Sequence, residues 1–161
     1  MWIMKGKDMA VLAGFILLCL AAGAIGSIFT FQSIPTWYAG LNKPDFSPPN
    51  WVFGPVWTTL YIMMGIAAYL VYGQGMKKKE AGFALTLFGV QLVLNTLWSI
   101  LFFGLQNPLY GLVCIIALWL SIAATIWKFY GISKNAGLLL VPYILWVSFA
   151  SVLNLSIWML N

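Results

Sequence analysis

The sequence predicts an all-α membrane protein, a bundle of five transmembrane helices in which a long loop between the first two helices covers an aromatic pocket. Three observations predict the fold class. The 161 residues are 63% hydrophobic and 7% charged, and the mean hydropathy is +0.96, whereas a soluble domain carries roughly a quarter charged residues. Five apolar stretches reach the ~20 residues that a spanning helix needs. These stretches lack the alternation of barrel strands, so helices are the way to satisfy the backbone in lipid.

We expect one domain, residues 1–161, with five spans. The first follows Asp8 and is too long for a signal-peptide core, so it is interpreted as a retained helix. The second begins after Asn50, and the third follows a run of three lysines. The fourth starts at Asn107 and Pro108, a suitable N-cap and first helical residue. The spans cover residues 9–31, 51–73, 81–105, 108–130 and 136–160.

The distribution of lysine predicts the orientation, since the chain has no arginine. Lys43 falls on one side of a five-span topology, and the other seven lysines fall on the opposite side: Lys5, Lys7, Lys77, Lys78, Lys79, Lys128 and Lys134. The positive-inside rule then places the N-terminus in the cytoplasm, and the loop of residues 32–50 and the C-terminus outside; in a bacterium this would be the cell membrane. The net charge of +5 is therefore attributed to topology and anionic lipid, and not to nucleic-acid binding.

The residue types argue against several kinds of chemistry. There is no histidine, and the side-chain carboxylates are Asp8, Asp45 and Glu80. Ion-coupled transport depends on ionisable groups within the membrane, and acid–base or nucleophilic catalysis usually needs a histidine or a perturbed carboxylate. Cys19 and Cys114 stand alone in different spans and are read as packing residues. We expect no metal site and no required cofactor, and a conventional enzyme is disfavoured.

Aromatic residues instead repeat at helical spacing in four spans, beside small residues or amides on the same face. The stripes are Trp57, Tyr61 and Gly65; Gln91, Asn95, Trp98 and Phe102; Trp119, Ala123 and Trp127; and Trp146, Ala150 and Asn154, with Pro142 and Tyr143 just above them. Helix packing alone explains any single stripe. Four stripes with no charge between them favour a shared aromatic cavity for a large, flat, mostly apolar ligand.

The loop of residues 32–50 is rich in proline and aromatic residues. Pro44, Pro48 and Pro49 fix their own φ and favour extended backbone before them, and a connection of this length in a compact bundle is usually functional. We expect it to fold over the helix ends, so that a lid over the cavity mouth is formed by Trp37, Tyr38, Phe46 and Trp51. The alternative is a loop that merely rests on lipid headgroups.

Three segments resemble the translocator protein family, also called tryptophan-rich sensory proteins or peripheral-type benzodiazepine receptors. They are "WYAGLNKPDFSPPNWVFGPVWTTLYIMMGIAAYLV", "QLVLNTLWSILFFG" and "LVPYILWVSFASVLNLSIW". The resemblance implies a five-helix bundle, often a homodimer, with a pocket beneath the first loop. It also implies binding of porphyrins such as protoporphyrin IX and haem. Animal members bind cholesterol as well, and some bacterial members are reported to degrade porphyrin in light.

Matched by position, the family's pocket tryptophans correspond to Trp57 and Trp146. The resemblance implies further ligand-binding positions at Trp37, Tyr38, Tyr61, Asn95, Trp98, Tyr143 and Ala150. The family's usual "KPSW" is "KPDF" here, so that Phe46 replaces a loop tryptophan and Asp45 adds a negative charge. That charge disfavours anionic propionate groups near the lid.

The predicted function is a membrane receptor or binding protein for tetrapyrroles that senses, sequesters or transports porphyrin, with the porphyrin as ligand. Two alternatives remain open. One is a light- and oxygen-dependent porphyrin-degrading enzyme in which Trp57 and Trp146 would be the catalytic residues. The other is a sterol- or lipid-binding scaffold, for which residues 70–77 contain one match to a weak cholesterol pattern.

Overall fold

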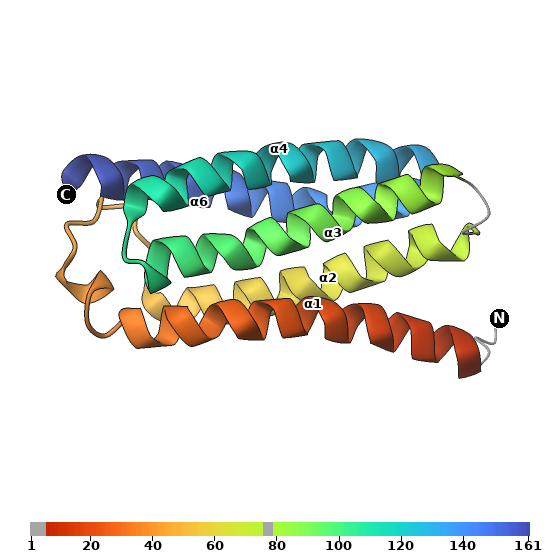
Figure 1. Ribbon diagram of the computed structural model, residues 1–161, viewed down its shortest axis with the longest axis horizontal. Helices are drawn as coiled ribbons and strands as arrows, with labels where there is room; N and C mark the ends of the chain where they lie inside the picture. The colour runs from red at the N-terminus through yellow and green to blue at the C-terminus, as the bar shows by residue number, and fades with distance from the viewer. Residues whose placement is uncertain (1–5, 76–78) are drawn as a thin grey trace.

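The protein is a bundle of long helices (Figure 1), seen in a computed structural model that describes residues 6–75 and 79–161. Within those ranges there is no strand, and five helical stretches are long and apolar enough to cross a membrane. The prediction of an all-α membrane protein with five spans is confirmed. Lys5, Lys77 and Lys78, on which part of the orientation argument depends, lie outside the described residues.

The helices follow one another through short turns, except for the long loop after the first. In chain order the segments are α1 (Gly6–Ser33), the short 3-10 turns η1 (Tyr38–Gly40) and η2 (Asn50–Val52), α2 (Phe53–Gly73), α3 (Lys79–Ser99), the π-helical turn η3 (Ile100–Gly104), α4 (Pro108–Ile132), α5 (Lys134–Leu139) and α6 (Val141–Leu160). The loop and the end of α6 lie at one end of the bundle, and the start of α1 lies at the other (Figure 1).

The start of α4 follows the prediction from sequence. The side-chain oxygen of Asn107 accepts hydrogen bonds from the backbone N–H groups of Leu109 and Tyr110, each at 3.1 Å, and Pro108 opens the helix. These bonds satisfy two donors that the first helical turn leaves free. The N-cap predicted at Asn107 is therefore confirmed.

The last span differs from the continuous helix predicted over residues 136–160. It consists of α5 and α6, with a break at Leu140, although the two segments together make one apolar span from Lys134 to Leu160. Pro142 explains the break, since proline has no N–H to continue the ladder and is favoured in the first turn of a new helix. The amide of Ile144 resumes the pattern by donating to the carbonyl of Leu140 at 3.2 Å.

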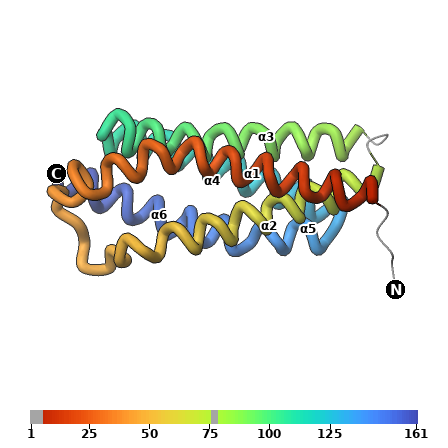
Figure 2. The backbone as a smooth tube through the Cα atoms, turned by 90° about the horizontal axis from the view of Figure 1, so that it is seen from below, coloured from red at the N-terminus to blue at the C-terminus, as the bar shows by residue number. Residues whose placement is uncertain are grey.

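Helices α1 and α2 touch in the middle of the bundle and separate towards the loop (Figure 2). At Gly65 the backbone of α1 lies so close that a Cβ atom would come within 2.6 Å of the Ile16 Cα. Gly65, a member of the predicted stripe on the second span, therefore serves helix contact and not ligand binding. The separation of the two helices beyond this contact makes room for a cavity.

Candidate ligand-binding site

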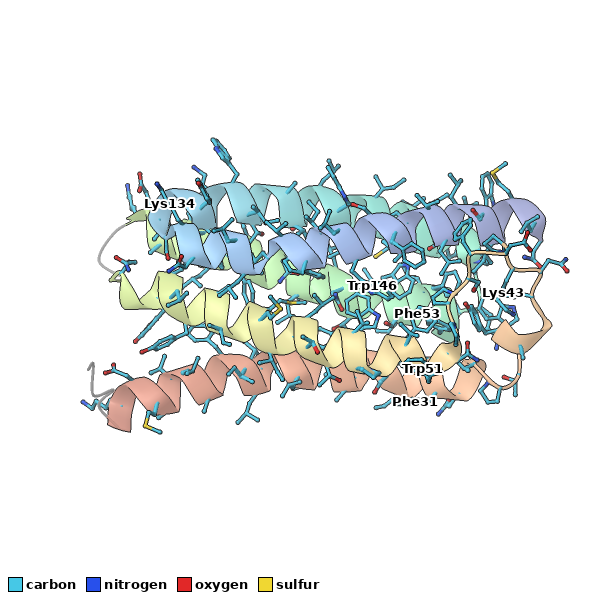
Figure 3. The ribbon with its side chains drawn as sticks, turned by 180° about the vertical axis from the view of Figure 1, so that it is seen from behind. Phe31, Lys43, Trp51, Phe53, Lys134 and Trp146 are labelled. Carbon is cyan, nitrogen blue, oxygen red and sulfur yellow. The ribbon has the colours of Figure 1, made fainter. Side chains whose placement is uncertain are left out.

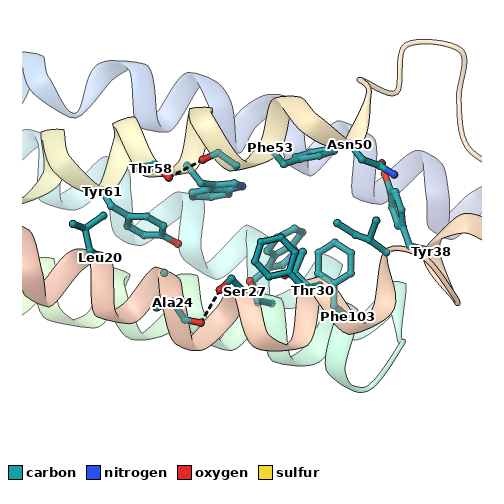
Figure 4. A pocket seen from close by; sticks show the side chains of 17 residues that line it. Leu20, Ala24, Ser27, Thr30, Tyr38, Asn50, Phe53, Thr58, Tyr61 and Phe103 are labelled. Atoms are coloured by element: carbon teal, nitrogen blue, oxygen red, sulfur yellow. Dashed lines mark hydrogen bonds between the residues drawn. The ribbon is translucent and has the colours of Figure 1, made fainter.

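A cavity of about 340 Å³ lies between α1, α2 and α3 at the loop end of the bundle (Figure 4). We call it the main cavity. Its lining carries no charged side chain and is formed by Leu20, Gly23, Ala24, Ser27, Thr30, Phe31, Ile34, Tyr38, Asn50, Phe53, Gly54, Trp57, Thr58, Tyr61, Trp98, Ser99 and Phe103.

A smaller cavity of about 30 Å³ adjoins the main cavity between α2, η3 and α6. Both cavities are lined by Tyr38, Phe53, Trp57, Trp98 and Phe103, which we call the aromatic wall. The remaining lining of the smaller cavity consists of Phe102, Trp146, Ala150, Leu153, Asn154 and Ile157. A ligand in the main cavity would therefore lie against rings on one side.

Neighbouring aromatic residues orient the rings of the wall. Trp57 stacks on Tyr61, with ring centroids 5.7 Å apart and an interplanar angle of 26°. Trp98 stacks on Phe102 at 5.4 Å and 22°, and meets Phe103 nearly edge-on at 5.8 Å and 84°. Offset stacked and edge-to-face pairs are the preferred aromatic geometries. The wall is thus held in shape without a ligand.

The π-helical turn η3 brings two consecutive phenylalanines into the site. Leu105 N–H donates to the carbonyl of Ile100 at 2.8 Å, a bond that spans five residues. This wider turn changes the register of the helix, and such turns are frequent at functional sites. Phe102 is 2% exposed and Phe103 is 8% exposed, so both rings of this turn are buried at the site.

A buried chain of neutral hydrogen bonds supports the inner end of the main cavity. The Tyr61 hydroxyl donates to the Asn95 side-chain oxygen at 2.6 Å, and the Asn95 amide nitrogen donates to the Tyr143 hydroxyl at 2.7 Å. The Tyr143 hydroxyl in turn donates to the Gln91 side-chain oxygen at 2.7 Å. The chain joins α2, α3 and α6 and places the Tyr61 ring at the cavity surface.

A second pair of hydrogen bonds holds Trp98. Its indole N–H donates to the side-chain oxygen of Asn154 at 3.1 Å, and the Asn154 amide donates to the carbonyl of Pro108 at 2.8 Å. Asn154 therefore connects α3, α6 and the start of α4. Both the oxygen and the nitrogen of the Asn154 side chain are hydrogen-bonded to other protein groups. Asn154 therefore presents no free polar group to the smaller cavity.

The loop contributes Tyr38, which is 3% exposed. The Lys43 ammonium group donates to the carbonyl oxygens of Tyr38 and Leu41 at 2.7 and 3.2 Å, and lies 4.7 Å from the centre of the Tyr38 ring. Burial raises the pKa of the Tyr38 phenol, an effect that the Ser47 side chain partly opposes. The phenol therefore stays neutral at ordinary pH.

The loop is also fastened to the end of α6. The backbone N–H of Asn42 donates to the side-chain oxygen of Asn161 at 3.0 Å, and the Asn161 amide donates back to the Asn42 carbonyl at 2.9 Å. The Asn42 side chain adds a bond to the carbonyl of Leu160 at 3.3 Å. We call these three bonds the Asn42–Asn161 clasp.

The predicted site residues fall into three groups. Tyr38, Trp57, Tyr61 and Trp98 line the main cavity, and Trp146 and Ala150 line the smaller one. Asn95 and Tyr143 lie behind the cavities in the buried chain. Trp37 and Phe46 line neither cavity: Trp37 packs edge-on against Phe102 at 5.5 Å, and Phe46 packs against Phe149 at 6.2 Å.

Two expectations from the sequence are corrected by the structure. The stripe on α4 does not share the cavity: Trp127 is 72% exposed, Trp119 donates its indole N–H to Ser148 of α6 at 2.8 Å, and neither tryptophan lines a cavity. Trp51, expected in the lid, is 75% exposed and lines neither cavity; exposed tryptophan at a span end is typical of an interfacial anchor. Helical spacing shows which residues share a face, but not where that face points.

Several lining residues were missed by the sequence analysis. Phe53 precedes Trp57 by four residues, so extending that stripe by one turn would have found it. The face of α1 formed by Gly23, Ala24 and Ser27 carries no aromatic signal, and Phe103, which lies in η3, is not a member of the predicted stripe on that span. Small residues at helical spacing are the one sequence feature that marks the α1 face.

The chemistry available to the site is stacking, burial and a few neutral hydrogen bonds. Within residues 6–75 and 79–161 no group of three His, Cys, Asp or Glu side chains could hold a metal ion. Apart from the indole N–H groups of its tryptophans, the polar side chains that line the main cavity are Ser, Thr, Asn and Tyr. Such a surface suits a flat apolar ring.

Comparisons with known proteins identify one family. Residues 15–159 match the family model described as TspO/MBR. The chain is 54% identical over 150 residues to the tryptophan-rich protein TspO of Archaeoglobus fulgidus, covering 93% of this chain and 96% of that protein. It is 52% identical over 155 residues to the protein of the same name from Chlorobaculum tepidum, with 96% and 98% covered. The translocator protein of Homo sapiens is 40% identical over 146 residues, with 90% and 86% covered.

Proposed function

Because the chain belongs to the TspO/MBR family of membrane proteins, we propose that it binds tetrapyrroles such as protoporphyrin IX or haem in the main cavity, and that it senses, sequesters or transports them. The observation that carries this proposal is the aromatic wall. Its five rings lie along an uncharged cavity between the helices at the loop end of the bundle. A flat macrocycle gains both apolar burial and ring stacking there.

The size of the cavity agrees with partial enclosure of such a ligand. Pockets for small molecules measure about 300–1,000 Å³, so the main cavity, at about 340 Å³, is at the lower end of that range. Part of a macrocycle would lie against the aromatic wall, and the remainder would extend out of the main cavity. Asn50 and Thr30, at the loop end of the lining, are neutral partners for the polar substituents of the ring.

Substitution of one ring in the wall tests this proposal, with an exposed tryptophan as the matched control. Trp57→Ala should weaken equilibrium binding of protoporphyrin IX at least about tenfold, since a stacked ring contributes about 0.5–1.5 kcal/mol beyond its buried area. Trp127→Ala removes an indole that is 72% exposed on the outside of α4 and should leave affinity unchanged. Titration in lipid nanodiscs measures both. Equal affinities in the two variants would contradict the proposal.

Porphyrin degradation in light is a second candidate function, favoured by the position of two indoles. Trp57 lines both cavities, and Trp146 lines the smaller cavity on the far side of the aromatic wall. Excited porphyrin passes energy to oxygen, and electron-rich indoles react readily with what forms. Both tryptophans would then lie close to a bound macrocycle, as such chemistry requires.

A further inference from the structure

The main cavity reaches the outside of the bundle between α1 and α2. Ala24 of α1 and Thr58 of α2 both line the cavity and are exposed. Phe31 also lines the cavity and is 71% exposed. A residue that belongs to both surfaces marks a connection between them, and the cavity is visible between the ribbons of the two helices in Figure 4. We call this connection the lateral opening.

Small residues keep the lateral opening wide. Gly23 and Ala24 on α1 face the cavity, and Gly54 on α2 lines it from the other side. At its inner end the opening is closed by Tyr61 of α2, whose ring packs so closely on Gly23 of α1 that there is no room for a Cβ atom. The opening is therefore confined to the stretch between this contact and the outer rim, where the cavity is lined by Ala24 and Ser27 on α1 and by Gly54 and Thr58 on α2.

The polar side chains beside the lateral opening are suited to lipid. The hydroxyls of Ser27 and Thr58 donate to carbonyl oxygens of their own helices, at Ala24 and Gly54, over 2.7 and 2.8 Å. Both helices are apolar spans, so the opening faces the hydrocarbon region. Hydroxyls bonded in this way expose no unsatisfied donor there.

Unlike the lateral opening, the side of the cavity beneath the loop is closed. Tyr38 is 3% exposed and caps the cavity, and the Asn42–Asn161 clasp ties the loop to α6. The hydroxyl of Ser33 adds a buried bond to the carbonyl of Phe103 at 2.6 Å, which joins the end of α1 to η3. Passage beneath the loop would require these bonds to break, whereas passage through the lateral opening breaks none of them.

We propose that the ligand moves between the bilayer and the main cavity through the lateral opening, while the loop stays closed. The ligand class is a flat amphiphile dissolved in the membrane, which enters with its ring between α1 and α2. Its polar edge stays near Phe31 and Trp51, two exposed aromatic residues on this side of the loop end (Figure 3) and of the kind found at headgroup level. The inference rests on the proposed function, in that the cavity binds a membrane-soluble ring.

A cysteine at the back of the cavity tests the route without any porphyrin. Ser99→Cys places a thiol on the α3 wall of the main cavity, and the parent chain, whose Cys19 and Cys114 are buried, measures background labelling. In liposomes, a pyrene maleimide dissolved in the bilayer should label the introduced thiol, and a charged, membrane-impermeant maleimide should not.

Neighbouring threonines supply a matched pair for closing the opening. Thr58 and Thr59 are both exposed and both donate to a carbonyl four residues back, at 2.8 and 2.9 Å, but only Thr58 lines the cavity. Thr58→Phe should slow labelling by pyrene maleimide at least tenfold, and Thr59→Phe should leave it within twofold. Asn161→Ala, which loosens the clasp, should also leave it unchanged. Ala24→Phe gives a second obstruction, from the facing helix, should Thr58→Phe fail to fold.

The same variants separate this proposal from the binding proposal. Thr58→Phe should lower the association and dissociation rates of protoporphyrin IX together. Unchanged labelling in Thr58→Phe and Ala24→Phe, or faster labelling by the charged reagent in Asn161→Ala, would overturn the lateral route in favour of passage beneath the loop. If the labelling results hold and protoporphyrin IX shows no saturable binding, the tetrapyrrole assignment fails and the lateral opening stands.

Discussion

Single side chains behind the aromatic wall carry the polar part of the site. In the chain from Tyr61 through Asn95 to Tyr143 and Gln91, each hydroxyl or amide has a partner within 2.7 Å. Because these groups are buried, a lost partner cannot be replaced by water. Through these hydrogen bonds, the Asn95 amide of α3 holds Tyr61 of α2 in position, and with it the Trp57 ring that stacks on Tyr61.

Asn95→Leu should destabilise the fold by about 1–2 kcal/mol, because it leaves the Tyr61 hydroxyl without its acceptor and removes the bond donated to the Tyr143 hydroxyl, which keeps only its bond to Gln91. Tyr61→Phe, which removes one hydroxyl and keeps the ring, is the matched control and should cost less. Thermal unfolding in detergent, followed by circular dichroism, compares the two. A Tm for Asn95→Leu equal to that of the parent protein would show that the chain contributes nothing to stability.

The degradation candidate predicts a difference between two double variants that each remove two indoles. Trp57→Phe/Trp146→Phe should abolish protein-dependent porphyrin loss in light, while Trp119→Phe/Trp127→Phe, changed at positions that line neither cavity, should retain it. Absorbance decay and product masses are measured with each protein saturated with porphyrin. Identical decay and products in both variants would leave the protein as a binder.

Local features of the helical elements decide which residues reach the site. The turn η3 brings Phe102 and Phe103 inward together, and the break at Leu140 starts α6 anew, so that Tyr143, Trp146 and Ala150 lie on one face. The N-cap at Asn107 defines where α4 begins. Each feature follows from a local backbone preference, and each shifts side chains by a fraction of a helical turn.

The cap on α4 can be tested alone. Asn107→Ala removes the acceptor for the backbone N–H groups of Leu109 and Tyr110 and should lower stability by about 1 kcal/mol. Asn107→Ser keeps a capping oxygen and should lose less. The thermal unfolding temperature of each variant checks this order. The reverse order, with Ser more damaging than Ala, would refute the cap as the source of the effect.

Among the lysines of residues 6–75 and 79–161, Lys43 is in the loop, and the others lie near the opposite ends of the helices. Lys43 and Lys134 lie at opposite ends (Figure 3), and the loop and the end of α6 share one end through the Asn42–Asn161 clasp. An odd number of spans places the two ends of the bundled chain on opposite sides of the membrane. With the positive-inside rule, we propose that the loop faces outward and the start of α1 faces the cytoplasm.

A pair of cysteine variants tests this orientation. Ser47→Cys in the loop should react with a membrane-impermeant thiol reagent in intact bacterial cells, and Gln74→Cys after α2 should react only after the cells are opened. Gln74 is exposed and is preferable to Gly75, whose φ of 103° disfavours any side chain. Labelling of Gln74→Cys alone in intact cells would reverse the orientation.

The composition of the sequence also predicts how the iron of haem affects the affinity of a porphyrin for the cavity. The chain has no histidine to act as the common axial ligand of haem iron, so stacking should dominate affinity. Iron-free protoporphyrin IX should bind about as tightly as haem in parallel titrations. Much tighter binding of haem, with a spectrum showing strong axial ligation, would contradict this account of the cavity.

The sequence alone predicted the class of the fold and much of the aromatic wall. The sequence contains five apolar stretches long enough to cross a bilayer. These stretches must form helices, because backbone groups in lipid have to be hydrogen-bonded locally. Helical spacing placed Trp57, Trp98 and Trp146 beside small or amide residues, and all three line a cavity. These predictions succeed because hydrophobicity and the 3.6-residue period are properties of neighbours along the chain.

Only the packing of distant segments decided the rest. The stripe on α4 has the same spacing as the stripe on α6, yet Trp127 is 72% exposed; which face turns inward depends on where the other helices lie. The α1 side of the cavity includes small residues such as Gly23 and Ala24, which become part of a lining because α1 and α2 separate between the contact at Gly65 and the loop. The lateral opening exists for the same reason, since a gap between two helices is a relation between their axes and is encoded in neither helix.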